Sequence, residues 1–170
     1  MKVKILILAG GKSERFWPFA DKTLFPFLGK PLIEHQIERI KGAGFQDLTV
    51  VCSKNNLAAI KKLGVKTILQ KGQGQAAAIL SAEKLFKGPF LVINANDIFE
   101  PDLLKKVTLI GQEKSVDACL VGFKSPSYFP GGYLIVNQKQ EVKGVIEKPD
   151  EGSEPSNLVR IVVEIGRAHV

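Results

Sequence analysis

The chain has 170 residues, 45% of them hydrophobic and 24% charged, which is typical of a globular domain and excludes a disordered or low-complexity chain. Its net charge of +7 comes from scattered lysines and arginines without interleaved aromatic residues, so we expect a small anionic ligand rather than nucleic acid. Two cysteines and two histidines are too few for a disulfide scaffold or a Cys- or His-rich metal site. No apolar run reaches the roughly 18 residues that span a bilayer, so we expect a soluble cytoplasmic protein that needs no membrane.

The first predicted element is a strand over residues 3–9, a continuous apolar run that ends at Gly10 and is typical of a strand buried on both faces. A polar, proline-containing loop is predicted up to Lys30, and a helix with one apolar stripe follows from Pro31 to about Gly42. Strands and helices then alternate, with strands predicted over residues 48–52, 65–69 and 90–94, helices over 57–63 and 75–86, and a further helix that begins at Pro101. This alternation predicts an α/β fold, a Rossmann-like, doubly wound and mostly parallel sheet.

The pattern changes after residue 115. Three strands are predicted there without helices between them, over residues 116–122, 133–137 and 142–146. In a doubly wound sheet, right-handed crossovers place the loops that follow the parallel strands at one edge, where ligands bind. We therefore expect the loops 10–30, 70–74 and 96–100 to meet at a ligand site.

The loop after the first strand carries glycines and positive charge. Gly10 and Gly11 permit positive φ angles and close backbone approach, so their amides can face phosphates or a base, and Arg15 and Lys22 follow in the same loop. A tight turn with solvated charges is the alternative interpretation. A P-loop is excluded because its spacing would place the first glycine at Leu6, inside the strand.

Asp97 follows the predicted strand 90–94. A carboxylate at that edge of the sheet is a candidate Mg²⁺ ligand, and the alternative is a turn residue before the helix at Pro101. Residues 72–77 also match the dinucleotide fingerprint G-x-G-x-x-A, with Asp97 at the expected distance, which leaves an NAD-dependent oxidoreductase as an alternative. This alternative does not explain the 10–30 loop.

Near the end of the chain, Glu147 and Lys148 precede Pro149. A glutamate can accept hydrogen bonds from sugar hydroxyls and a lysine can hold a phosphate, while an exposed charged pair before a turn proline is the alternative. Gly132 either brings the backbone close to a ligand or begins a strand.

Together these motifs resemble the sugar-1-phosphate nucleotidyltransferase family. The family patterns A-G-G-x-G-T-R and P-K-x-L-x-P-x-x-G-K-P-L are similar to residues 9–15 and 21–32, and its base-binding loop is similar to residues 70–78. Its metal-binding G-D is similar to residues 96–97, and its sugar-site glycine and E-K-P are similar to Gly132 and residues 147–149. This sequence departs from the family pattern at three places: residues 13–14 replace Gly-Thr, Asp21 replaces proline and Asn96 replaces glycine. The forms G-G-K-S-x-R and D-K also resemble the molybdenum-cofactor guanylyltransferases.

The resemblance implies a fold of the nucleotide-diphospho-sugar transferase type and a transfer that uses Mg²⁺. A sugar-1-phosphate attacks the α-phosphorus of a nucleoside triphosphate, and pyrophosphate leaves. The implied roles place Arg15 at the triphosphate and pyrophosphate, Lys22 at the α-phosphate and Asp97 at the metal. The implied nucleotide-binding residues are Ala9, Gly10, Gly11, Ser13, Gln70 and Gly74, and the implied sugar-phosphate-binding residues are Gly132, Glu147 and Lys148.

Several alternatives stay open. A nucleotide-binding regulatory module of the same fold would need neither Lys22 nor Asp97. The glutamines at 70, 73 and 75 favour a pyrimidine, whereas residues 15–18 resemble the guanylyltransferase branch, so the base, the sugar and homo-oligomerisation are undecided. The final residues 164–170 resemble a translated adapter, so we expect residues 1–163 to be an incomplete nucleotidyltransferase domain, truncated at its C-terminus, and residues 164–170 to be a non-native tail. Whether that truncated chain is active also stays open.

Overall fold

The computed structural model describes residues 3–13, 16, 18–19, 21–113 and 115–167. The chain divides into two compact units, the first made of residues 1–119 and 163–170 and the second of Leu120–Val162. Within the described ranges, no helix combines the length and the apolar character that a membrane span requires.

The first unit contains a sheet with four parallel strands. Its order is β5-β4-β1-β6, and the end of β10 adds an antiparallel strand beside β6. The register sets Ala9 opposite Cys52 and Leu8 opposite Asn94, so the carboxyl ends of these strands lie at the same edge. The predicted mostly parallel α/β sheet is therefore confirmed. The strands are β1 (Lys4–Ala9), β4 (Leu48–Cys52), β5 (Lys66–Leu69), β6 (Pro89–Asn94) and β10 (Leu158–Arg167).

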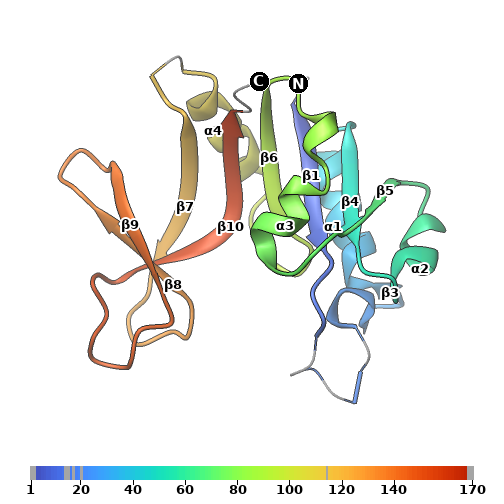
Figure 1. Cartoon of the computed structure of the whole chain (residues 1–170), viewed down its shortest axis with the longest axis horizontal. Helices are drawn as coiled ribbons and strands as arrows, with labels where there is room; N and C mark the ends of the chain where they lie inside the picture. The colour runs from blue at the N-terminus through green and yellow to red at the C-terminus, as the bar shows by residue number, and fades with distance from the viewer. Residues whose placement is uncertain (1–2, 14–15, 17, 20, 114, 168–170) are drawn as a thin grey trace. The chain divides into compact units, whose positions relative to one another are not determined.

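Helices cover this sheet on both faces, with α3 on the near face and α1 on the far face in Figure 1. The continuous apolar sequences of β1 and β4 follow from this arrangement, because neither face of these strands meets water. Helix α1 buries Ile33, Ile37 and Ile40 at helical spacing, as its apolar stripe predicts. The helices are α1 (Leu32–Gly42), α2 (Leu57–Lys61), α3 (Gly74–Leu80) and α4 (Asp102–Gly111), with short 3₁₀ turns η2 (Lys22–Leu24) and η3 (Glu83–Leu85).

The helix predicted over residues 75–86 is interrupted. Helix α3 ends at Leu80, and the 3₁₀ turn η3 follows. The physical reason is Ser81, whose hydroxyl donates to the carbonyl of Ala77 at 2.7 Å and accepts the amide of Lys71 at 2.8 Å. A serine bonded in this way favours the end of a helix over its interior. The long loop predicted up to Lys30 likewise contains η2 and a short hairpin of β2 (Pro26–Phe27) and β3 (Lys30–Pro31).

Strand β10 was not predicted from the sequence. Its last residues belong to the segment 164–170, and they pair with β6, with Ile165 opposite Leu91. Ile165 is only 1% exposed. Strand pairing does not bear on the origin of these residues, so the division into residues 1–163 and a non-native tail stays a prediction.

The second unit is built from antiparallel strands. Strand β7 (Ala118–Lys124) leads into it, and β8 (Gly132–Val136) pairs with β9 (Val142–Glu147). The first residues of β10 pair with β8, with Val159 opposite Tyr133. Tyr133 is 1% exposed, and its hydroxyl accepts the amide of Phe129 at 2.8 Å. The three late strands predicted from the sequence are thus present with small shifts of their ends.

Candidate active site

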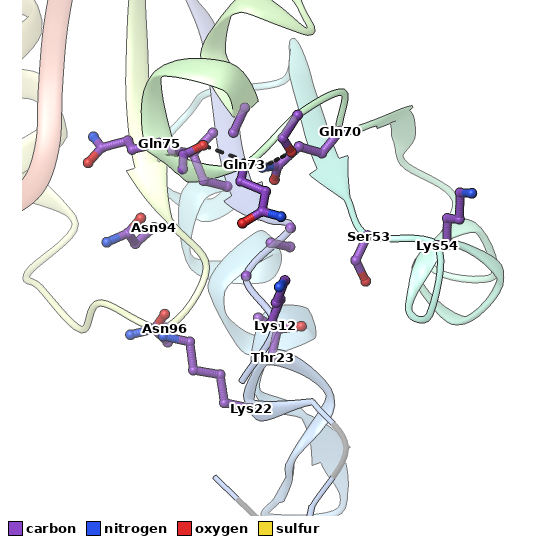
Figure 2. Close-up of a pocket in the computed structure, with 17 residues that line it drawn as sticks. Lys12, Lys22, Thr23, Ser53, Lys54, Gln70, Gln73, Gln75, Asn94 and Asn96 are labelled. Carbon is purple, nitrogen blue, oxygen red and sulfur yellow. Dashed lines mark hydrogen bonds between the residues drawn. The ribbon is translucent and has the colours of Figure 1, made fainter. Parts of the chain in front are cut away.

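A pocket of about 910 Å³ lies in the first unit, at the carboxyl ends of the parallel strands. This volume is within the range of small-molecule sites. Figure 2 shows polar side chains around one space, which come from the segments that follow β1, β4 and β5 and from the end of β6. Its polar and glycine lining residues are Gly10, Gly11, Lys12, Lys22, Thr23, Ser53, Lys54, Gln70, Gly72, Gln73, Gly74, Gln75, Asn94 and Asn96.

The glycine loop contributes close backbone approach. A Cβ atom added to Gly10 would overlap Oε1 of Gln70 and lie 2.8 Å from its Cδ. At Gly11 no described atom lies within 4 Å of an added Cβ. The positive φ angle expected in this loop occurs at Ser13, at 53°, and at neither glycine. The absence of a side chain at Gly10 therefore makes room for Gln70, and the backbone angle of Gly10 does not itself demand glycine.

Gln70 joins this loop to the loop after β5. Its Nε2 donates to the carbonyls of Gly72 at 3.1 Å and Gly74 at 3.3 Å, so the side chain is held while it lies over Gly10. Figure 2 marks these bonds beside Gln73. The loops after β1 and β5 are therefore in contact, as we expect for two loops that form one ligand site.

We expect Gly10→Ala to fold normally and to weaken binding of a nucleoside triphosphate about tenfold or more. The new methyl group displaces the Gln70 amide, which then loses its bonds to two carbonyls, each worth about 1 kcal/mol. Isothermal titration calorimetry measures the affinity, and thermal denaturation measures the stability. Gly42→Ala is the matched control, because a Cβ there meets no described atom within 4 Å. Unchanged affinity in Gly10→Ala would contradict this account of the loop.

Lys22 lies in the 3₁₀ turn η2. Asp21 precedes the turn and accepts the amide of Thr23 at 2.8 Å, and the amide of Lys22 donates to Oγ of Ser13 at 3.2 Å. The backbone of Lys22 is therefore tied on both sides. In Figure 2 its side chain extends along the pocket toward Asn96. This arrangement places an ammonium group inside the pocket on a held backbone.

Asp97 lies immediately after the pocket-lining Asn96. One carboxylate oxygen accepts a hydrogen bond from the side-chain Nδ2 of Asn94 at 3.2 Å, and the other accepts one from the side-chain Nδ2 of Asn96 at 3.3 Å. Its backbone carbonyl accepts Nε2 of Gln36 from helix α1 at 2.7 Å. Among the residues that the structure describes, there is no group of three or more histidine, cysteine, aspartate or glutamate side chains that could hold a metal.

Cys52 ends strand β4 beneath the site and is fully buried. Burial, together with the negative charge of Asp21, raises the pKa of its thiol to about 11. The thiol therefore stays protonated near neutral pH and is unsuited to act as a nucleophile. Cys52 is therefore a packing residue of the sheet.

The predicted sugar-phosphate residues lie together in the second unit. Gly132 is opposite Glu147 in the β8–β9 pair, and a Cβ at Gly132 would lie 2.8 Å from Oε1 of Glu147. Lys148 has a φ angle of 47°, and its amide donates to the carbonyl of Gly131 at 3.0 Å. Arg160, which the sequence analysis did not single out, lies 3.6 Å from the Glu147 carboxylate.

The structure brings most of the predicted nucleotide-binding residues into the pocket, namely Ala9, Gly10, Gly11, Gln70 and Gly74, and the predicted catalytic residue Lys22 lines it too. Ser13 contacts the Lys22 backbone, and Arg15 lies outside the described residues. The sequence analysis missed Thr23, Ser53, Lys54 and Asn94. Asn94 ends strand β6 and Ser53 follows β4, so their positions at strand ends were the available signal.

Residues 5–133 match the MobA-like NTP transferase domain, and the chain belongs to this family. It is 32% identical over 166 residues to a bifunctional sugar-1-phosphate nucleotidylyltransferase/acetyltransferase of Sulfurisphaera tokodaii, which covers 92% of this chain and 39% of that protein. It is 30% identical over 131 residues to a probable molybdenum cofactor guanylyltransferase of Thermococcus sibiricus, over 76% of this chain and 63% of that protein. The chain thus spans 39% of the length of the Sulfurisphaera relative.

Solved structures confirm the predicted fold. A putative glucose-1-phosphate thymidylyltransferase from Bacillus anthracis superposes with a TM-score of 0.81 at 21% identity, over 97% of this chain and 71% of that one. A UDP-glucose pyrophosphorylase complexed with UDP-glucose superposes with a TM-score of 0.76 at 25% identity, over 97% of this chain and 76% of that one. The resemblance to sugar-1-phosphate nucleotidyltransferases is likewise confirmed by the curated relatives.

Proposed function

We propose that this protein is a sugar-1-phosphate nucleotidyltransferase, which joins a nucleoside triphosphate to a sugar-1-phosphate and releases pyrophosphate. The observation that carries the proposal is the pocket of about 910 Å³, in which the Gly10 loop, the Gln70 loop and Lys22 line one space. The Sulfurisphaera relative supports the substrate class. We further propose that this reaction takes place in the cytoplasm.

In this proposal, the Gly10 and Gly11 backbone binds the nucleotide, and the loop from Gln70 to Gly74 contacts the base. Lys22 stabilises the negative charge that grows on the α-phosphate as the sugar-1-phosphate oxygen attacks. Because the backbone of Lys22 is already tied to Asp21 and Ser13, little reorganisation is needed during the reaction. Arg15 would contact the departing pyrophosphate.

The residues near Asp97 fit a magnesium ion. Mg²⁺ prefers oxygen ligands and is commonly bound by one or two carboxylates together with substrate phosphates, and Asp97 offers such a carboxylate between two pocket-lining asparagines. Bound there, the ion would neutralise phosphate charge. Asn94 and Asn96 would orient the carboxylate. Gly132, Glu147 and Lys148 would bind the sugar phosphate.

A second candidate is a molybdenum-cofactor guanylyltransferase. It is favoured by the Thermococcus relative, of which this chain covers 63%, and by the Asp21-Lys22 pair in place of Pro-Lys. Both candidates share the nucleotide pocket and differ in the acceptor. The identity of the acceptor therefore separates them, and homo-oligomerisation stays a prediction in either case.

The test combines binding and turnover. The chain is melted with Mg²⁺ and each of ATP, GTP, CTP, UTP and dTTP, and pyrophosphate release is then followed with a panel of hexose-1-phosphates. We expect one nucleotide to raise the melting temperature, because a ligand at 100 times its Kd stabilises the folded state by about 2.7 kcal/mol. A cooperative transition that no nucleotide shifts would contradict the proposal. A shift with GTP, with pyrophosphate released only when molybdopterin is added, would favour the second candidate.

A further inference from the structure

A buried polar network lies directly behind the pocket. Asn56 is 0% exposed and Asp21 is 9% exposed. The Nδ2 atom of Asn56 donates to the Asp21 carboxylate at 2.6 Å and to the carbonyl of Ala9 at 2.7 Å. A side-chain amide has two such donors, so both are used. Asn56 therefore links the last residue of β1 to the carboxylate that precedes Lys22.

The network also reaches β4 and the turn η2. The Oδ1 atom of Asn56 accepts the amide of Ser53 at 2.9 Å, just after β4. On the other side, Oδ1 of Asp21 accepts both the amide and the hydroxyl of Thr23, at 2.8 and 2.6 Å. Ala9, Ser53 and Thr23 all line the pocket. The end of β1, the turn η2 and the start of the loop after β4 are thus joined by one buried pair of side chains.

We propose that Asn56 is a positioning residue that acts through Asp21 to hold the turn carrying Lys22 against the ends of β1 and β4. The inference rests on the proposed function in one respect, the catalytic role of Lys22. Asp21 and Thr23 flank Lys22 in sequence, and Thr23 is hydrogen-bonded to the Asp21 carboxylate, so the network holds the backbone on both sides of Lys22.

The network also explains a departure from the nucleotidyltransferase pattern, which has proline where this chain has Asp21. The φ angle of Asp21 is −152°, whereas proline is restricted to about −65°. Proline would neither fit this backbone nor supply the carboxylate. In this chain the turn before the lysine is fixed by hydrogen bonds to Asn56 instead of by a ring.

The first experiment needs no substrate. Amide hydrogen exchange is measured by NMR in the wild type, Asn56→Asp and Asp21→Asn. Asn56→Asp sets two carboxylates against one another, and Asp21→Asn, the milder variant, replaces one of the two accepting oxygens with an NH2 group that faces a donor. We expect the Thr23 amide to exchange about tenfold faster or more in both, while Val50 in the central sheet keeps its rate. Asn55→Asp is the matched control. It makes the same charge change as Asn56→Asp one position away, at a residue that is exposed.

The second experiment tests whether the network acts through Lys22. Asp21→Asn is expected to lower kcat about tenfold or more, with the KM for the triphosphate changed less than about threefold. In a Lys22→Ala background, the same change should have no further effect on kcat, because the group that it positions is gone.

Unchanged exchange at Thr23, or additive losses of kcat in the double variant, would overturn the positioning role. A wild-type chain without turnover would instead contradict the proposed function and the role of Lys22. The exchange measurement would still decide whether Asn56 fixes the turn. The two failures are therefore distinguishable.

Discussion

Lys22→Ala is expected to lower turnover about 10²- to 10³-fold and to raise the KM for the nucleoside triphosphate less than about threefold. In the proposed mechanism the ammonium group acts on charge that develops during the transfer, so its loss should affect the transition state more than the bound substrate. Steady-state kinetics of pyrophosphate release measure both constants. A turnover number equal to that of the wild type would remove Lys22 from the mechanism.

The variant Lys54→Ala tests whether the effect of Lys22 depends on its position in the pocket or only on its positive charge. Lys54 lines the same pocket from the loop after β4, but it is exposed and lies away from Lys22 in Figure 2. Lys54→Ala and Lys22→Ala each remove one positive charge from the pocket. If only the overall electrostatic field of the pocket mattered, both variants would lower kcat to a similar extent. We expect a change of less than about fivefold for Lys54→Ala. Lys22→Arg should recover only part of the activity, because a guanidinium differs in shape from an ammonium.

Deletion of residues 164–170 is expected to destabilise the first unit by about 3–5 kcal/mol. The deletion removes Ile165, which is 1% exposed and whose side chain fills the space over Gly111 of helix α4. It also removes the pairing of β10 with β6 from Glu164 onward and leaves an unpaired strand edge. Urea denaturation followed by circular dichroism measures the loss.

Deletion of residues 168–170 alone is the matched control, and we expect it to change the stability by less than about 0.5 kcal/mol. Equal stability of the longer deletion and the wild type would contradict the structural role of Ile165.

The parallel sheet could be predicted because β1, β4 and β6 are short apolar runs followed by turn residues, and such runs need no knowledge of distant contacts. The position of the site followed from the same pattern, since parallel strands bring their carboxyl ends to one edge. The predicted contributions of Gly10, Lys22 and Gln70 to one pocket are consistent with this rule.

The buried network could not be predicted in the same way. Asn56 and Asp21 are separated by 35 positions, and Asn56 belongs to none of the motifs that carry the resemblance. Nor does local sequence indicate that Ile165 fills the space above Gly111, because that contact joins a helix to a strand far along the chain. Contacts of this kind depend on the assembled fold, so pattern and propensity carry little information about them.

Under the proposed function, the contact between Gln70 and Gly10 limits how a preference for one base could be redesigned in this chain. A segment that keeps glutamine at position 70 would have to keep glycine at position 10, because the Gln70 side chain occupies the place of a methyl group there. Exchanges that keep Gln70 and alter Gln73 or Gln75 leave that contact intact. Libraries for altered base selection should therefore vary the second half of the loop first, and should change positions 10 and 70 only together.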